Sequence, residues 1–490
     1  MAHTKVNRID RRGFLAGSVA AGAAATLAGP FAGFLAPASA GRGAPALGPV
    51  PDLRDGTVRL WLPDGFAYRS FHDTEQTVTL DDGTVLPGRH DGMAAFRGGN
   101  GNAVLVRNHE VNNPVPAFGD ASAAYDPMAG GGTTTIEVTR EGEVLGAYTS
   151  LNGTQMNCAG GEMPWGSWVT CEETINGPDV GPDFTGASNV PLTQPHGFIF
   201  EVPAGGQSSR EPITAAGRFA HEAVALDPRE GVLYLTEDNF GFPSGFYRYL
   251  QPGHPMSRRR LVDGGRLQML AVKGHPQADL AAEQPAGATY DVEWVDIDDP
   301  APTFPYTPGE TAPTSNNTAI TYVGDQGRAR GAAWFSRLEG AVYDRGLVYF
   351  TSTQGGGDPE PGPSDPVQGF GNGSGQVWAY DPKASRLRLV YQSPGPEVLD
   401  LPDNITVSRR GTLVLCEDSP GDNYLRALSR HGHLTDIALN RLVGGNDVPR
   451  FGDEFAGACF SPDGGTLFVN IQASRGMTIA IWGPWHTLGV

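Results

Sequence analysis

Positive charge is scarce in this sequence. Lys and Arg together number 35 against 54 Asp and Glu, which gives a formal net charge of −19. A field of this sign repels polyanions and concentrates cations near the protein, so we expect no nucleic-acid partner. The simpler interpretation is that the acidity only keeps an exported protein soluble.

The N-terminal region lacks the roughly 20 strongly apolar residues that a membrane-spanning helix needs. Residues 13–40 are uncharged, but they are rich in Ala and Gly and only weakly hydrophobic. They follow the motif Asp10-Arg11-Arg12-Gly13-Phe14-Leu15 and end at Ala38-Ser39-Ala40. This pattern predicts a cleavable twin-arginine signal peptide over residues 1–40, with a membrane anchor as the alternative. We therefore expect the twin-arginine translocation machinery as a partner, and a periplasmic, cell-surface or extracellular location.

Cysteine is rare, and the signature of a serine hydrolase is missing. The four cysteines, Cys158, Cys171, Cys416 and Cys459, allow three disulfide connectivities, and their spacing does not choose among them. No Gly-x-Ser-x-Gly motif is present, and the segment 371–375 lacks the strand–turn–helix context of a phosphate or nucleophile loop. The sequence therefore offers no candidate for a nucleophilic serine.

Turn-forming residues are abundant. The chain contains 68 Gly and 40 Pro, spread throughout without a long linker, which favours many short strands over long helices. Six copies of a hairpin unit can be aligned, beginning at Asp91, Pro164, His221, Leu338, Asp403 and Phe455. Their unequal spacing, with a long insertion over 250–335, predicts one all-β domain over residues 41–490, a six-bladed β-propeller with elaborated loops. A large β-sandwich array is the alternative.

In a propeller the inner strands face one axis, so polar residues at equivalent strand ends meet in one cavity. Most of these residues are acidic: Asn108, His109, Glu110, Cys171, Glu172, Glu173, His221, Glu222, Glu237, Asp238, Arg337, Glu339, Asp403, Asn404, Glu417, Asp418 and Glu454. Converging carboxylates repel one another unless cations compensate them, and oxygen ligands suit Ca²⁺. A Cys171 thiolate would add iron or zinc, although a disulfide with Cys158 or a buried apolar role explains Cys171 equally simply.

Arg337 stands two residues before Glu339, so the two side chains lie on the same face of a strand. A guanidinium among metal-bound carboxylates indicates an anionic ligand. The planar guanidinium can donate two parallel hydrogen bonds to a phosphate group. A plain salt bridge between Arg337 and a neighbouring acid is the alternative. The histidines His109, His196 and His221 can ligate metal or simply make hydrogen bonds.

Nine ordered motifs between about Leu62 and Trp485 resemble those of the PhoX alkaline phosphatases, also known as the DUF839 family. The motifs are Arg107-Asn108-His109-Glu110, Gly131-Gly132-Thr133-Thr134-Thr135, Asn157-Cys158-Ala159-Gly160-Gly161, the segment 164–173, His221-Glu222-Ala223, Arg337-Leu338-Glu339-Gly340-Ala341, the segment 375–382, Pro402-Asp403-Asn404 and the segment 455–464. The resemblance implies a monomeric, exported phosphatase that releases phosphate from small-molecule monoesters, with a six-bladed propeller and a buried cluster of Fe³⁺ and Ca²⁺.

By the same resemblance, Cys171 and Glu172 would be ligands on the iron side, Glu222 and Glu339 would bind cluster metals, and Arg337 would contact substrate phosphate. These roles make Arg337, Cys171 and Glu172 the expected catalytic residues. Four further residues match the motifs and are expected to bind metal or support its ligands: Asn108, Glu110, Asn157 and Glu173. Loading of a Cys171 site before export would also explain a twin-arginine route, because an oxidising compartment pairs free thiols.

We therefore expect metal-assisted hydrolysis of phosphate monoesters, used to scavenge phosphate. Two other functions fit parts of the sequence. A calcium-dependent propeller lactonase or phosphotriesterase would need Ca²⁺ but neither a thiolate nor iron. A non-catalytic binding propeller would use metals only as structural staples.

Overall fold

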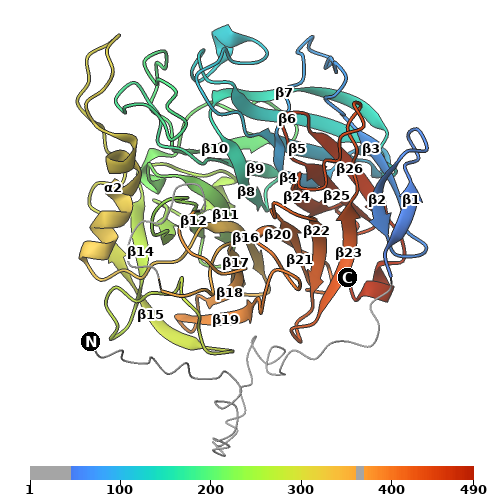
Figure 1. The fold of residues 1–490 in the computed structure, drawn as a ribbon. Coiled ribbons are helices and arrows are strands. Elements are labelled where there is room, and N and C mark those ends of the chain that lie inside the picture. Colours follow the sequence, from blue (N-terminus) through green and yellow to red (C-terminus); the bar gives the residue numbers. More distant parts are fainter. Residues whose placement is uncertain (1–45, 360–368) are drawn as a thin grey trace, which may run out of the picture.

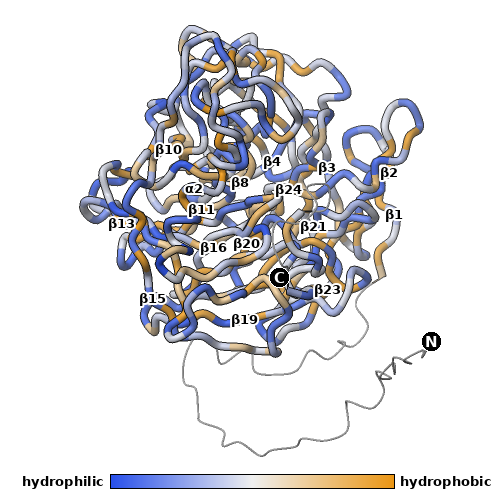
Figure 2. The backbone as a smooth tube through the Cα atoms, turned by 60° about the vertical axis from the view of Figure 1, so that its left-hand side comes forward, coloured by the Kyte–Doolittle hydropathy of each residue, from blue (hydrophilic) through white to orange (hydrophobic). Residues whose placement is uncertain are grey.

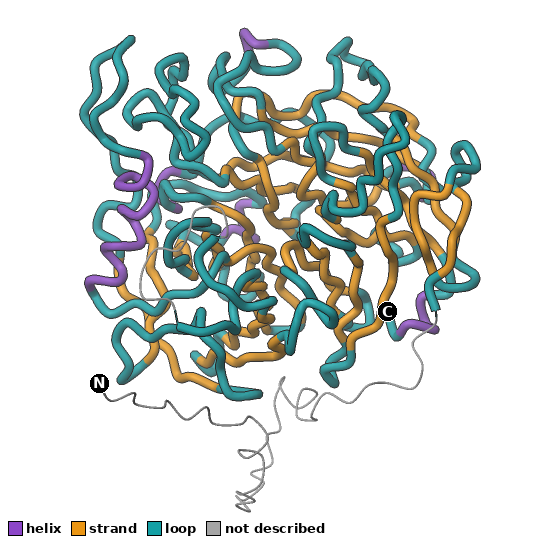
Figure 3. The backbone as a smooth tube through the Cα atoms, in the orientation of Figure 1, coloured by secondary structure: helices purple, strands orange, loops and turns teal. Residues whose placement is uncertain are grey.

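The computed structural model describes residues 46–359 and 369–490. The predicted signal peptide, residues 1–40, lies outside these residues. The described chain consists of short strands joined by turns and long loops, and helix is confined to a few segments (Figure 3). No described helix is long and apolar enough to cross a membrane.

The described residues form two α-helices, α1 (Pro255–Arg258) and α2 (Asn316–Ala329), and both lie in the insertion between the two halves of the chain. The helix α2 begins at Ser315, whose hydroxyl accepts a hydrogen bond from the Thr318 backbone N–H at 3.2 Å. It lies at the edge of the molecule, away from the centre (Figure 1). Short 3₁₀ turns occur at Gly99–Gly101, Ala121–Ala123, Thr214–Ala216 and Trp485–Leu488.

Hydrogen bonds join the strands into five sheets. The first contains β4 (His90–Arg97), β5 (Ala103–His109), β6 (Gly131–Val138) and β7 (Val144–Thr154). The second contains β8 (Asn157–Met163), β9 (Ser167–Glu172) and β10 (Ile199–Pro203). The third runs in the order β11 (His221–Asp227), β12 (Val232–Glu237), β13 (Phe246–Leu250), β14 (Arg266–Val272), β15 (Thr289–Asp296), β19 (Arg386–Gln392), β18 (Gln376–Asp381), β17 (Leu347–Ser352) and β16 (Leu338–Asp344).

The last two sheets combine strands from both ends of the described chain. The fourth runs in the order β1 (Gly48–Pro51), β2 (Val58–Leu62), β23 (Leu434–Asn440), β22 (Tyr424–Leu428), β21 (Leu413–Glu417) and β20 (Pro402–Val407). The fifth contains β24 (Phe455–Phe460), β25 (Thr466–Ile471), β26 (Met477–Trp482) and β3 (Ala67–Phe71). Pairing of β2 with β23 and of β3 with β26 ties the N-terminal strands to the C-terminal sheets, which covers two sheet edges.

All six predicted hairpins are present as antiparallel pairs, although the second begins at Asn157 rather than at Pro164. Contacts between their first strands form a closed ring in the order β4, β8, β11, β16, β20, β24. These strands lie at the centre of the molecule, and later strands such as β7, β15, β19 and β23 lie toward its periphery (Figure 1). The fold is therefore all-β and propeller-like, as predicted.

The number of blades differs from the prediction. Four of the five sheets contain the four or more strands of a propeller blade, so the described structure has four blades of this kind rather than six. One reason is that β15 pairs with both β14 and β19. This pairing joins the four strands β11–β14 and the four strands β16–β19 into one sheet, so they do not form two separate blades. The other is that the sheet of β8, β9 and β10 has only three strands.

Apolar side chains between the sheets form the core. In the largest sheet, for example, the buried rings of Phe246 and Phe350 stack with centroids 4.3 Å apart, and Trp378 is fully buried beside Phe335. Hydrophobic stretches follow the strands, whereas many outer loops are hydrophilic (Figure 2). Burial on both faces of the sheets holds the inner strand ends in fixed positions.

Candidate metal centre

Each of the six first strands loses its regular pairing close to its start. The pairing is interrupted between His90 and Met93, Asn157 and Gly160, His221 and Val224, Leu338 and Ala341, Pro402 and Ile405, and Ala456 and Cys459. Such irregularities re-aim side chains and are common next to active sites. The residues freed from regular pairing in the first five strands include Asp91, Cys158, Glu222, Glu339 and Asp403.

A second set of acids directly follows the second strands of the hairpins. Their backbone N–H groups donate to the carbonyl oxygen of the residue before the first strand, as in Glu110 to Arg89 (2.9 Å), Glu173 to Met156 (2.9 Å) and Asp418 to Leu401 (3.0 Å). Asp238 makes the same bond to Ala220, at 3.1 Å. These repeated bonds hold carboxylates from different hairpins at one end of the ring.

Three groups of possible metal ligands result, each with its ligand atoms within 4.8 Å of one another. The groups share Glu222 and Asp403 and therefore form one continuous array. We call this set the acidic array, and its members are Cys158, Glu173, Glu222, Glu339, Asp403, Asp418 and Glu454. Cys158, Glu222 and Glu339 are buried, whereas the other four members are partly accessible to solvent.

The electrostatics of the acidic array favour bound cations. Burial, together with the charge of Asp403, raises the pKa of Glu222 well above its usual range, and burial and Asp238 do the same for Glu339. Glu222 Oε2 is buried and accepts no hydrogen bond within the described structure. An oxygen-rich cluster with so few donors fits hard cations.

Arg337 lies beside the acidic array. Its Nη2 donates to Asp238 Oδ2 at 2.9 Å and to Glu339 Oε1 at 2.8 Å, and its guanidinium lies 5.0 Å from the centre of the Phe240 ring. Burial opposes the charge of Arg337, but Asp238 and Glu339 outweigh this effect and raise its pKa well above the ordinary value. The backbone of Arg337 is left-handed, with φ 42°, a conformation that costs energy and clusters at functional sites.

Glu110 is held by a second guanidinium and does not belong to the acidic array. Arg89 donates from Nε to the Glu110 carbonyl oxygen at 2.6 Å and forms an ion pair with the Glu110 carboxylate. Gln472 donates to the Glu110 carboxylate and, at 3.1 Å, to Asp91 Oδ2. Burial raises the pKa of Asp91, and the neighbouring Glu110 raises it further.

The two cysteines of the second hairpin have different environments. Cys158 is the only sulfur ligand in the acidic array, and its Sγ donates to the His221 carbonyl oxygen at 3.2 Å. Both cysteines pack in the same apolar cluster, with residues such as Val169 and Ile199. Cys171, however, belongs to none of the three ligand groups. The strand pairing differs between the two cysteines, because Cys171 pairs with Ile199 in the regular ladder of β9 and β10, whereas Cys158 lies where the pairing of β8 is interrupted.

Glu172 is fully occupied by hydrogen bonds. Its two oxygens accept from Gln155 N at 2.9 Å, His196 Nδ1 at 2.6 Å, Gly197 N at 2.9 Å and Phe198 N at 3.1 Å. Burial disfavours the charged form of His196, but the charges of Glu172 and Asp126 outweigh the effect of burial and raise the pKa of His196 to about 9.

Because its four hydrogen bonds go to the loop after β9 and to Gln155, Glu172 anchors that loop and lies outside the array. Its equivalents in other hairpins also turn away, since Glu237 bonds Tyr247 and Glu417 pairs with Arg426.

Asn108 and Asn157 support the backbone around Cys158. Asn108 Nδ2 donates to the carbonyl oxygens of Cys158 (2.6 Å) and Ala159 (2.8 Å), and its Oδ1 accepts from Trp168 Nε1 at 2.8 Å. Asn157 bonds the hydroxyls of Thr154 and Thr170. Both amides are satisfied by protein partners, and neither residue belongs to the acidic array.

Sequence reasoning missed Cys158 as a member of the acidic array, and it missed Asp91 and Arg89, which lie beside Glu110. The sequence signal that could have identified them is the second position of the first strands, which holds Asp91, Cys158, Glu222 and Glu339. The predicted second hairpin starts at Pro164, after its true first strand, so Cys158 does not align with the other three residues.

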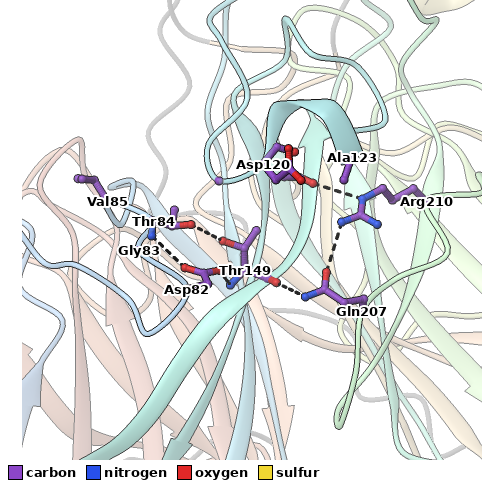
Figure 4. A pocket seen from close by; sticks show the side chains of 11 residues that line it. Asp82, Gly83, Thr84, Val85, Asp120, Ala123, Thr149, Gln207 and Arg210 are labelled. Atoms are coloured by element: carbon purple, nitrogen blue, oxygen red, sulfur yellow. Dashed lines mark hydrogen bonds between the residues drawn. The ribbon is translucent and has the colours of Figure 1, made fainter.

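Cavities in the described part of the chain also lie outside the acidic array. A narrow one of about 100 Å³ runs along small residues that follow the array residues in the first strands, including Ala159, Ala223 and Gly340. A larger surface pocket of about 690 Å³ is lined by polar side chains from the outer part of the first sheet and nearby loops (Figure 4). Its side chains bond one another, as in Thr84 to Thr149 at 3.0 Å and Gln207 to the Thr149 carbonyl oxygen at 2.7 Å.

The chain matches the family model described as alkaline phosphatase PhoX over residues 46–147 and 143–474. Pseudomonas fluorescens PhoX in complex with vanadate, a transition state analogue, aligns at 18% identity and TM-score 0.62, covering 90% of this chain and 97% of that chain. Virginiamycin B lyase from Staphylococcus aureus aligns at 10% identity and TM-score 0.37, covering 85% and 99% of the two chains. No curated protein matches the chain.

Proposed function

This chain belongs to the alkaline phosphatase PhoX family, and from that premise we propose that it hydrolyses phosphate monoesters at a mixed centre of iron and calcium. The observation that carries the proposal is the acidic array beside Arg337, which combines ligands for several cations with a donor for a phosphoryl group. Vanadate, the transition state analogue bound by Pseudomonas fluorescens PhoX, is consistent with phosphoryl chemistry in a relative of the same fold.

The side chains of the array fit both metals. Carboxylates of Glu339, Asp403, Asp418 and Glu454 are the oxygen ligands that Ca²⁺ prefers. Cys158 adds a thiolate, which suits Fe³⁺, beside Glu173 and Glu222. When bound, such ions supply Lewis acids that neutralise charge on a phosphoryl group. Burial raises the pKa of the Cys158 thiol, so a cation beside it is needed to stabilise the thiolate.

We assign the sulfur ligand to Cys158 in place of Cys171. The place of Cys158 in a ligand group with Glu173 and Glu222 supports this assignment, as do the regular pairing of Cys171 with Ile199 and the four hydrogen bonds accepted by Glu172. Glu172 and Asn108 then act as positioning residues. They hold the loop after β9 and the backbone of Cys158, respectively.

Arg337 is the residue that we assign to substrate. Asp238 and Glu339 hold one edge of its guanidinium, and Nη1 has no acceptor among the described residues. The free edge can donate to equatorial oxygens of a phosphoryl group, where donors stabilise charge as it moves toward the leaving oxygen. Water is kept from the inner part of the site by the burial of Glu222 and Glu339.

Export and assembly complete the proposal. Arg11 and Arg12 support translocation of the folded, metal-loaded protein by the twin-arginine route, to the periplasm, the cell surface or the medium. We further propose that the protein acts as a monomer on small phosphate esters and does not bind nucleic acid, in keeping with its net charge of −19.

The test combines metal analysis with activity. Purified protein is expected to contain iron and calcium and to hydrolyse p-nitrophenyl phosphate, with activity lost on chelation and restored by Ca²⁺.

The substitution Arg337→Lys tests the role of the guanidinium. Lysine keeps the positive charge but cannot donate two parallel hydrogen bonds to a phosphoryl group, so kcat is expected to fall roughly a hundredfold while the metal content stays the same. Arg330→Lys, at an exposed ion pair with Asp298, is the matched control. Protein loaded with both metals that hydrolyses no phosphate ester contradicts the proposal.

A further inference from the structure

Arg89 occupies the position in the first hairpin that Arg337 occupies in the fourth. Each arginine directly precedes a first strand, β4 or β16, and each has a left-handed backbone, with φ 49° and 42°. The carbonyl oxygen of each accepts a 2.9 Å hydrogen bond from the residue after the second strand, Glu110 or Thr353. The two side chains are therefore equivalent by fold position.

The two arginines lie on opposite sides of the ring of first strands. In the order β4, β8, β11, β16, β20, β24, the strands β4 and β16 are three steps apart in both directions. Arg337 pairs directly with Glu339, a member of the acidic array. Arg89 is linked to the array through Glu110 and Gln472, because Gln472 donates to the Glu110 carboxylate and its backbone N–H donates to the carbonyl oxygen of Glu454 at 3.1 Å. The array thus lies between two cationic groups.

Arg89 differs from Arg337 in exposure and in its partner. Its side chain is 39% exposed, against 12% for Arg337. Its ion-pair partner Glu110 is not a member of the acidic array, whereas Glu339, the partner of Arg337, is a member. Within the described residues, Nη1 of Arg89 donates to no acceptor. Arg89 therefore offers a donor at the outer margin of the site, where the part of a substrate nearest solvent would lie.

We propose that Arg89 binds a second anionic group on the alcohol portion of the substrate. The inference rests on the proposed phosphatase function and adds a substrate class to it: phosphate monoesters whose alcohol carries a carboxylate or a further phosphate. A guanidinium opposite Arg337 favours such esters because the two anionic groups of the ester can each meet a cation.

Glycerol 3-phosphate and 3-phosphoglycerate form a matched pair of substrates, because they differ by one carboxylate. In the metal-loaded protein we expect a lower KM for 3-phosphoglycerate. Arg89→Gln should raise that KM about five- to tenfold, with KM for glycerol 3-phosphate changed less than about twofold. Arg330→Gln, which removes a guanidinium of similar exposure (41%), should change neither KM.

A second variant and a salt series separate binding from structure. Arg89→Lys should retain part of the preference, and 0.5 M NaCl should reduce it in the unmodified protein, because a partly exposed charge pair is screened. Equal losses on both esters, or a loss of bound metal in Arg89→Gln, would mean that Arg89 only compensates Glu110 and would overturn the inference. Hydrolysis of neither ester by the unmodified, metal-loaded protein would instead contradict the proposed function.

Discussion

At the scale of single residues, the centre depends on which side of a strand a side chain occupies. Cys158 and Cys171 lie in the same hairpin, yet among the described residues only Cys158 forms a ligand group with Glu173 and Glu222, with the ligand atoms within 4.8 Å of one another. Cys171 is buried among apolar residues, where burial raises the pKa of its thiol well above the ordinary value. Burial raises the pKa of the Cys158 thiol in the same way, but Cys158 alone of the two lies in a ligand group where a cation would stabilise its thiolate, so the two cysteines should respond differently to substitution.

Serine substitutions at the two cysteines test this assignment. Cys158→Ser should lose most of the bound iron and reduce phosphatase activity roughly a hundredfold, because serine is a poor iron ligand. Cys171→Ser should keep its iron and activity but lose about 1–3 kcal/mol of stability, since it buries a hydroxyl group in the core. Elemental analysis, activity and thermal melting measure the three effects. Iron loss in Cys171→Ser alone would reverse the assignment.

The sequence could predict the acids of the centre better than its sulfur. Residues such as Glu222 and Glu339 stand next to recognisable strand patterns, so their convergence follows from a propeller. The environment of Cys158 depends on an irregular first strand, whose residues Asn157–Met163 include three small residues and show no clear alternation. Because the sequence shows no clear strand around Cys158, it favours Cys171, in the regular strand β9, as the sulfur ligand.

At the scale of elements, the centre requires close approach of neighbouring first strands. Gly340 follows Glu339 in β16, and a Cβ atom at this position would lie 2.6 Å from Ile405 N and 2.9 Å from the Asp403 carbonyl oxygen in β20. The missing side chain lets β16 and β20 hold Glu339 and Asp403 within one ligand group. A methyl group here should push the two strands apart.

Gly340→Ala is therefore expected to weaken cation binding without touching a ligand. Overpacking of this kind costs about 1–3 kcal/mol, and we expect Ca²⁺ affinity to fall about tenfold. Gly205→Ala is the matched control, because an added Cβ at that turn meets no atom within 4 Å. Calorimetric titration of metal-depleted protein with Ca²⁺ measures the difference. Equal affinities for the two variants would show that the strand spacing does not control the site.

The elements themselves were predictable to different degrees. Hairpins are local, and turns such as Asp227–Gly231 between β11 and β12 carry a clear signal in Asp227-Pro228 and Gly231. The grouping of hairpins into sheets is not local. Pairing of β15 with β19, and of β2 with β23, joins strands far apart in sequence, and no short pattern in either strand specifies its partner.

At the scale of the whole molecule, acidity is concentrated where cations can compensate it. The formal net charge is −19, and burial together with neighbouring acids raises the pKa of Glu173, Glu222, Glu339, Asp403 and Glu454 well above the usual range. Excess acid on an exposed surface promotes solubility, but these side chains lie together at the centre of the fold. The protein without cations should therefore depend on their protonation for stability.

The pH dependence of stability follows from these shifts. A carboxyl group whose folded pKa is raised contributes stability that is fully present below its unfolded pKa, near 4, and that is lost as pH rises through the folded value. Metal-free protein should therefore melt at a lower temperature at pH 8 than at pH 5. Cations compete with the same protons, so Ca²⁺ binding should strengthen as pH rises.

Thermal melts of metal-depleted protein with and without Ca²⁺ at the two pH values measure this coupling. Calcium at a hundred times its dissociation constant should raise the Tm by about 3 °C for each bound ion at pH 8 and much less at pH 5. Glu339→Gln should diminish the rise at pH 8, because it removes a carboxylate from the acidic array. Glu310→Gln, at an exposed site, should leave it unchanged. A rise that is larger at pH 5 than at pH 8 would mean that the buried carboxylates are not the groups that bind the cation.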